Sequence, residues 1–232
     1  MWTRKELKEK AKAGLNRNYW KAVLVCGIIY AFLCGGSSAG HASMSSNAVL
    51  SSNTSSADLG LSEGALVGIG TAVLLLLIAV IIVLIILKAL LINPLEVGIA
   101  KFELNAVKSE ANVSDLGSGF DVSYKRNAKA MFIYYLYIVI GLIIFIIPGI
   151  IIGYQLRMVP YILAENPGMD RKEAFAKSRE IMAGNKWKSF VLDLSFLPWI
   201  ILGSITLGIV NVFYVAPYIH LTHAALYEAI KK

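Results

Sequence analysis

Residues 130–164 decide the fold, and they read AMFIYYLYIVIGLIIFIIPGIIIGYQLRMVPYILA, with Arg157 as their one charge. A helix of about 20 apolar residues already spans the hydrocarbon core of a bilayer, so this stretch is too long for a single crossing. Pro148-Gly149 lies near its middle, and a proline–glycine pair is typical of a turn. The stretch therefore predicts two short membrane helices that meet at this turn.

Three further apolar blocks extend the pattern. Residues 19–36 and 65–91 each predict one membrane helix, whereas residues 190–227 are too long for one crossing and are split near Thr206-Leu207-Gly208. A backbone in lipid must satisfy its own hydrogen bonds, and the sequence lacks the alternation of a membrane barrel. The prediction is one all-α, polytopic membrane helix bundle over residues 1–232. It has six transmembrane helices arranged as three hairpins, residues 19–92, 130–164 and 190–228.

Composition and the placement of charge agree with this topology. Hydrophobic residues make up 57% of the chain and charged residues 16%, whereas soluble domains carry about 25% charge. With six helices, all 22 Lys and Arg fall on one side or at its membrane edge, and the Ser-rich outer loop, residues 37–64, has none. The positive-inside rule then predicts a multi-pass protein of the bacterial plasma membrane with both termini in the cytoplasm. The net charge of +7 is explained by this orientation, and no nucleic acid partner is expected.

The cytoplasmic segments have amphipathic patterns of their own. Residues 1–18 and 165–189 each predict an amphipathic helix, and in the first Leu7, Ala11 and Leu15 share one face. A third such pattern follows Pro94 within the cytoplasmic segment 93–129. Two arrangements fit the spacing equally well. The helices lie along the inner membrane surface, or they pack on each other's apolar faces.

An internal repeat is suggested by short matches at the ends of the hairpins. Val159-Pro160-Tyr161-Ile162 and Ala216-Pro217-Tyr218-Ile219 each follow a Gly-initiated returning helix, and Asn93-Pro94-Leu95 ends the first hairpin. We predict three copies of one unit, a surface helix followed by a hairpin. Transporters built from repeats place their sites at the interface between the repeats. The alternative is chance, or the preference of Tyr for the membrane interface.

Two charges within the apolar blocks are candidate binding residues. Arg157 lies about two turns before Glu165, and an intramembrane charge is costly enough to suggest function. Asp193 is one turn inside the fifth predicted helix, and it would form a buried ion pair if it faced Arg157. The structural alternative is that Arg157 extends to the interface or pairs with a carboxylate. Glu96, at the inner end of the second helix, is interpreted as an interface anchor.

His220 and His223 are the remaining candidates for a binding site. They are three apart on the last predicted helix and can share a face, but a metal would need ligands from elsewhere, such as Asp193 or Glu228. The alternative is a pair of polar contacts at a helix end. The sequence contains no GxSxG, HExxH, P-loop or paired CxxC motif. We therefore expect no catalytic residue, no bound metal and no cofactor.

The second half of the chain resembles a bacterial integral membrane family known as domain of unknown function 975. Beyond Asp115-Leu116 and Pro148-Gly149, the resemblance rests on RMVPYILAENP at residues 157–167, then Glu173-Ala174, Ser178-Arg179, Met182-Ala183-Gly184-Asn185-Lys186, Phe190, Leu194-Ser195-Phe196, Trp199, Pro217-Tyr218, Thr222, Ala225 and Tyr227. Gly117 replaces a Phe typical of that family, while Phe120 keeps another. The family is distantly similar to the membrane domain of some glycerophosphodiester phosphodiesterases. The resemblance implies a six-helix membrane protein and no catalytic residues.

These sequence features are compatible with three functions. The first is a non-enzymatic membrane module that binds lipid, an amphipathic peptide or a partner membrane protein, with anionic lipids at its basic cytoplasmic face. The second is a small transporter or permease-like component, which would form a homo-oligomer because six helices are few for a carrier. The third is a membrane-embedded, metal-dependent enzyme that rests on His220 and His223 alone.

Overall fold

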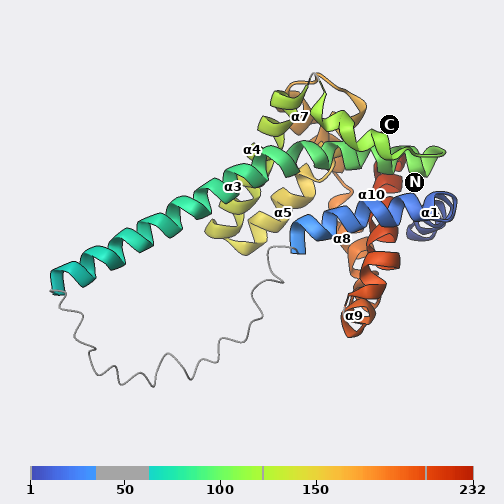
Figure 1. Ribbon diagram of the computed structural model, residues 1–232. Coiled ribbons are helices and arrows are strands. Elements are labelled where there is room, and N and C mark those ends of the chain that lie inside the picture. Colours follow the sequence, from blue (N-terminus) through green and yellow to red (C-terminus); the bar gives the residue numbers. More distant parts are fainter. Residues whose placement is uncertain (1, 35–62, 122, 207, 232) are drawn as a thin grey trace.

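The computed structural model describes residues 2–34, 63–121, 123–206 and 208–231, and these residues form an all-α protein without a strand. Nine α-helices are joined by a short 3₁₀ helix, η2, and a π-helical turn, η3 (Figure 1). Their bounds are α1 Arg4–Cys34, α3 Glu63–Lys108, η2 Val113–Phe120, α4 Tyr124–Ile144, α5 Ile146–Leu156, α6 Val159–Glu165, α7 Arg171–Met182, α8 Lys186–Leu194, α9 Leu197–Ile205, η3 Asn211–Val215 and α10 Ala216–Ile230. Residues 37–62 of the predicted Ser-rich loop lie outside the described residues.

A kink at Asn18 divides α1 where the sequence predicts the change from an amphipathic to a membrane helix. Asn18 has non-helical angles, φ −118° and ψ 25°. Its buried amide donates to the carbonyls of Ala106 and Ser109 and accepts from the backbone N–H of Ala111. The kink is thus stabilised by hydrogen bonds to the end of α3.

The second predicted membrane helix does not end before Pro94, as expected, but continues through it to Lys108 as one helix. Proline removes a single backbone hydrogen bond from a helix. The packing of η2 against α3 keeps the helical turn around Pro94 in place. A Cβ on Gly119 would lie 1.7 Å from the Pro94 carbonyl oxygen, and one on Gly98 would lie 2.1 Å from that of Leu116. This close approach of η2 outweighs the tendency of Pro94 to end the helix.

Helices α4, α5 and α6 cover the second predicted hairpin, and the break between α4 and α5 lies at Phe145 rather than at Pro148-Gly149. Phe145 is extended, with φ −154° and ψ 137°, and α5 begins at Ile146. Pro148 therefore falls in the first turn of α5, where a backbone N–H has no intrahelical partner to lose. Gly149 lets the two helices touch, because a Cβ there would lie 2.6 Å from the Leu142 nitrogen.

The split near Thr206-Leu207-Gly208 is confirmed. α9 ends at Ile205, and Gly208 has φ +86°, a conformation that favours glycine. Three helical segments are long and apolar enough to cross a membrane: Tyr124–Ile144, Ile146–Glu165 and Lys186–Ile205. The described residues therefore support the prediction of an all-α protein with membrane-spanning segments.

The molecule has a packed half and an exposed half. We define the packed half as the first part of α1, α3 from Ile92 onward, η2, α6, α7 and α10, and the exposed half as the rest. In the packed half, α6 and most of α10 are buried, and so are Leu7, Ala11 and Leu15 of α1. The amphipathic helices thus pack against protein, as in the second of the two arrangements that fit the sequence. In Figure 1 the first part of α3 projects away from the other helices.

Candidate functional site

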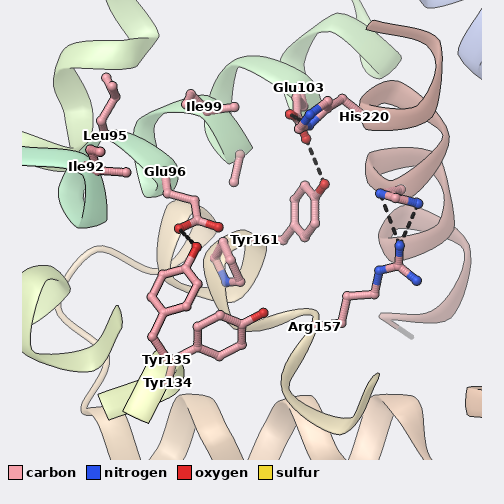
Figure 2. A pocket seen from close by; sticks show the side chains of 13 residues that line it. Ile92, Leu95, Glu96, Ile99, Glu103, Tyr134, Tyr135, Arg157, Tyr161 and His220 are labelled. Atoms are coloured by element: carbon pink, nitrogen blue, oxygen red, sulfur yellow. Dashed lines mark hydrogen bonds and ion pairs between the residues drawn. The ribbon is translucent and has the colours of Figure 1, made fainter. Parts of the chain in front are cut away.

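A cavity of about 270 Å³ opens between α3, α4, α6 and α10. Figure 2 shows that carboxylates, tyrosine rings, imidazoles and aliphatic side chains surround the same space. Its walls are formed by Ile92, Leu95, Glu96, Ile99, Ala100, Glu103, Tyr134, Tyr135, Arg157, Pro160, Tyr161, His220 and His223. The cavity therefore offers apolar surface and charge together, as binding sites for organic ligands usually do.

Glu96 and Glu103 occupy one face of α3, seven residues apart, which is two helical turns. The Tyr135 hydroxyl donates to Glu96 Oε2 at 2.7 Å. Among the described side chains, no Lys, Arg or His lies within ion-pair distance of Glu96. Withdrawal from water raises the pKa of the Glu96 carboxyl to about 7, although the hydrogen bond from Tyr135 opposes this. Glu96 is therefore the cavity carboxylate without a basic partner.

Glu103 is more deeply buried and has two partners. The Tyr161 hydroxyl donates to its Oε2 at 2.7 Å, and His220 Nδ1 lies 2.8 Å from its Oε1. The side chain of Glu103 is 5% exposed. A buried carboxylate is tolerated only with such partners, so this trio joins α3, α6 and α10 at the back of the cavity.

Arg157 and Asp193 form the predicted ion pair. Arg157 Nη1 and Nη2 donate to the two Asp193 carboxylate oxygens at 2.6 and 3.0 Å, and the Tyr154 hydroxyl donates to Oδ2 at 2.7 Å. His223 Nε2 lies 2.6 Å from Arg157 Nη2 and therefore accepts from it, because a guanidinium can only donate. The bidentate pair connects α8 to the turn after α5, and His223 adds α10.

Glu165, the fifth candidate, belongs to another cluster. It accepts from Lys108 at 3.1 Å and from the Tyr227 hydroxyl at 2.9 Å, and Lys231 also binds it. Lys108 and Lys231 both reach Glu228 as well. These residues join the ends of α3, α6 and α10, outside the cavity. Glu165 therefore lies apart from the cavity, and its role as a binding residue stays a prediction.

A second cavity, of about 370 Å³, lies along α4, α5 and Asp193. Tyr134 and Arg157 line both cavities. Its other walls are aliphatic side chains and glycines of α4 and α5, together with Tyr154. The ion pair between Arg157 and Asp193 thus stands where the two cavities meet.

The first cavity is lined by all three helical segments that follow the repeated prolines. Glu96 and Glu103 follow Pro94, Tyr161 follows Pro160, and the two histidines follow Pro217. The expectation that a site lies at an interface between repeats stays a prediction. The threefold repeat itself stays a prediction.

The sequence did not identify Glu96, Glu103 and the tyrosines as site residues. Glu96 lines the cavity instead of serving only as an interface anchor. The available signal was the pair of acids two turns apart on the face that follows Pro94. His220 Nδ1 lies beside the Glu103 carboxylate, whereas His223 Nε2 accepts from Arg157 and lies 3.0 Å from Asp193 Oδ1. Within the described ranges, no three His, Cys, Asp or Glu side chains cluster as metal ligands.

Comparison with known proteins gives one match. A family model described as "Protein of unknown function (DUF975)" matches residues 66–232. No curated protein and no solved structure matches the chain. The matched residues include the whole of the cavity and the ion pair between Arg157 and Asp193. The distant similarity to the membrane domain of glycerophosphodiester phosphodiesterases stays a prediction.

Proposed function

This chain belongs to the DUF975 family, and from the geometry of its cavity we propose that it is a non-enzymatic membrane protein that binds an amphipathic ligand. The ligand is a lipid, an amphipathic peptide or a segment of a partner membrane protein. The observation that carries this proposal is the cavity itself, because apolar side chains and the Glu96 carboxylate line one space next to a candidate membrane span. An amphiphile satisfies both kinds of surface at once.

The proposed topology has six transmembrane helices, with both termini in the cytoplasm of a bacterium. It adds residues 19–34, 65–91 and 209–228 to the three segments that are long and apolar enough to span a membrane. The cavity then lies at the cytoplasmic end of the bundle, since Glu96 follows residues 65–91 directly. This arrangement places the basic residues inside, in agreement with the positive-inside rule.

Anionic lipids are the proposed surroundings of the cytoplasmic end. The first part of α1 exposes five basic side chains, Arg4, Lys5, Lys10, Lys12 and Arg17. Each such residue near an anionic leaflet contributes about 1 kcal/mol to membrane attraction. These residues lie outside the cavity, so the headgroups that surround the protein and the ligand that it binds need not carry the same charge.

The test is native mass spectrometry of the protein released from lipid nanodiscs, with a variant that fills the cavity. Ala100 lines the cavity and is 2% exposed, so Ala100→Phe should exclude the ligand. Ala176→Phe adds the same side chain at an exposed position on α7 and is the control. We expect one amphiphile per chain in the wild type and the control, and none in Ala100→Phe. An adduct that persists in Ala100→Phe at the wild-type level would refute the proposal.

A second candidate function, a small transporter, is supported by the meeting of the two cavities at Arg157. An ion pair between two cavities is a natural place for a barrier that opens and closes. On this alternative, Arg157→Met abolishes uptake into proteoliposomes. A module that only binds loses stability in Arg157→Met and transports nothing in any variant. A homo-oligomer is expected for the transporter, since six helices are few for a carrier.

A further inference from the structure

We infer that the cavity selects amphiphiles that carry an ammonium group, with Glu96 as the counter-ion and the rings of Tyr134, Tyr135 and Tyr161 around the charge. This inference rests on the proposed function and specifies the chemistry of the ligand. The charges, the aromatic walls and the position of the cavity support it independently.

The balance of charge in the cavity is negative. Arg157 is neutralised by the Asp193 carboxylate, which receives two hydrogen bonds from it. Glu103 is satisfied by His220 and by the Tyr161 hydroxyl. Glu96 is left with the neutral Tyr135 hydroxyl as its hydrogen-bond donor. A cationic group of the ligand would supply the partner that Glu96 lacks.

The aromatic side chains provide a surface that suits a cation. Figure 2 shows Tyr134, Tyr135 and Tyr161 around the space that Glu96 faces. The rings of Tyr134 and Tyr135 lie edge to face with centroids 5.0 Å apart. Ammonium groups bind to the faces of aromatic rings, and cages of several rings with a carboxylate are a common solution for them. An anionic headgroup would instead meet Glu96 and Glu103 without an available cation.

The other walls of the cavity are apolar, and they indicate that the ammonium group of the ligand carries an apolar tail. Ile92, Leu95 and Ile99 of α3 line the cavity, and Ile92 and Leu95 lie between Glu96 and the predicted second membrane helix. Tyr135 is 41% exposed and its neighbour Leu136 is 44% exposed, so the α4 side is open toward the region that lipid would occupy. The ligand is therefore an alkyl ammonium compound and not a small hydrophilic cation.

Binding should depend on pH in a defined direction. The groups that face Glu96 are Glu103 on α3, Tyr134 and Tyr135 on α4, Arg157 and Tyr161 near α6, and His220 and His223 on α10. Because the pKa of Glu96 is raised to about 7, its ionised fraction increases about tenfold between pH 6 and pH 8. An alkyl amine keeps its proton over this range, as lysine does. Its affinity should therefore increase up to about tenfold from pH 6 to pH 8.

The test compares octylamine with octanol, which has the same chain length without the charge. Binding is measured by isothermal titration calorimetry on the protein in uncharged maltoside micelles, with protein-free micelles as the blank. We expect octylamine to bind at least about tenfold more tightly than octanol at pH 8, since a charged hydrogen bond adds more than a neutral one. Glu96→Gln should remove this preference, and Glu96→Asp should keep part of it. Glu110→Gln, an exposed acid beyond the end of α3, is the control.

Two sources of the ammonium group are distinguished by native mass spectrometry from nanodiscs with equal phosphatidylethanolamine and phosphatidylglycerol. Retained phosphatidylethanolamine that octylamine displaces identifies a lipid headgroup. A chain without retained lipid that still prefers octylamine identifies a free amphiphilic amine. Either outcome supports the inference.

The outcomes that overturn the inference are separate from those that overturn the proposed function. Equal affinity for octylamine and octanol, or an unchanged preference in Glu96→Gln, refutes the ammonium site and leaves an amphiphile-binding cavity. Selective retention of phosphatidylglycerol does the same. No binding of octylamine, octanol or lipid refutes the proposed function as well. The pH series on the wild type decides the question if Glu96→Gln does not fold.

Discussion

Apolar side chains are exposed at the turn between α4 and α5, but they are buried in and beside helices α6 and α10. At the turn, Ile143 is 78% exposed and Ile147 is 72% exposed, whereas Met158 beside α6 and Ala224 in α10 are fully buried. The turn contains no charge, while α6 and α10 hold Glu165, His220 and His223. Large apolar surfaces of this kind are rarely left in water. The exposed apolar surface is consistent with a membrane protein, whereas the packed half resembles the core of a soluble protein.

The largest expected effect is the removal of one partner of the ion pair between Arg157 and Asp193, which His223 of the packed half contacts. Arg157→Met leaves the Asp193 carboxylate without its bidentate partner, and since the two side chains are 18% and 28% exposed, the loss should be smaller than the roughly 3–5 kcal/mol of a fully buried pair. Equilibrium unfolding in mixed micelles measures the loss. Arg179→Met, on an exposed position of α7, is the control and should change stability by less than about 0.5 kcal/mol.

The double variant Arg157→Met with Asp193→Leu sharpens this test. Replacement of both charges by apolar side chains removes the unpaired carboxylate, so stability should recover part of the loss. A double variant that is less stable than Arg157→Met alone would contradict the assignment of Asp193 as the partner.

The next effect concerns the exposed half, where helix contact depends on glycine. Gly149→Val should destabilise the hairpin by about 1–3 kcal/mol, because the new side chain meets the Leu142 backbone. Gly153→Val, one turn later on α5, has no atom within 4 Å of its Cβ and is the matched control. Thermal unfolding in detergent compares the two. Equal losses would show that α4 and α5 do not pack through Gly149.

Much of this contrast between the halves was predictable from the sequence. Long apolar blocks predict the three helical segments that can span a membrane, and the change at Asn18 and the break near Gly208 follow from local chemistry. Arg157 and Asp193 were identified because a charge in an apolar block is conspicuous. Local rules failed at Pro94, where the packing of η2 keeps the helix continuous, and at Pro148, which fits the first turn of α5.

The cavity could not be predicted in the same way. Its walls come from helices that are far apart in the sequence, and Glu96 looks like an ordinary residue at a membrane edge until α4 places Tyr135 against it. His220 and His223 share a helix face but have different partners, because Glu103 lies on α3 whereas Arg157 follows α5. Such pairings depend on tertiary packing, which periodicity does not report.

A smaller effect is expected in the packed half, where Glu96 should make the stability of the protein depend on pH. Glu96 has a folded pKa of about 7, above the usual value of about 4.5 that it has in an unfolded chain, so the fold favours its neutral form. This contribution to stability is complete below about pH 4.5 and is lost as pH rises through 7. The melting temperature of the ligand-free wild type should therefore fall relative to Glu96→Gln between pH 5 and pH 8, by about a few degrees. Parallel pH profiles of the two proteins would contradict this account.

The smallest effect is expected at the outer surface of the packed half. Lys5 and Glu9 lie 4.0 Å apart, with side chains 88% and 68% exposed. An exposed pair on one helix contributes about 0.3–0.5 kcal/mol at most, so Glu9→Ala should be close to neutral in the same unfolding assay. A loss as large as that of Arg157→Met would mean that α1 has partners beyond its own surface.

We propose that the exposed half lies in lipid with its turns outside, and that the packed half faces the cytoplasm. Cysteine accessibility in intact bacterial cells tests it most directly, in a background where Cys26 and Cys34 are replaced by alanine. Ile147→Cys and Ile205→Cys, at the two predicted outer turns, should react with a membrane-impermeant maleimide in intact cells. Lys5→Cys and Arg179→Cys should react only after the membrane is opened. Labelling of Lys5→Cys or Arg179→Cys in intact cells, or protection of both turns, would contradict the account.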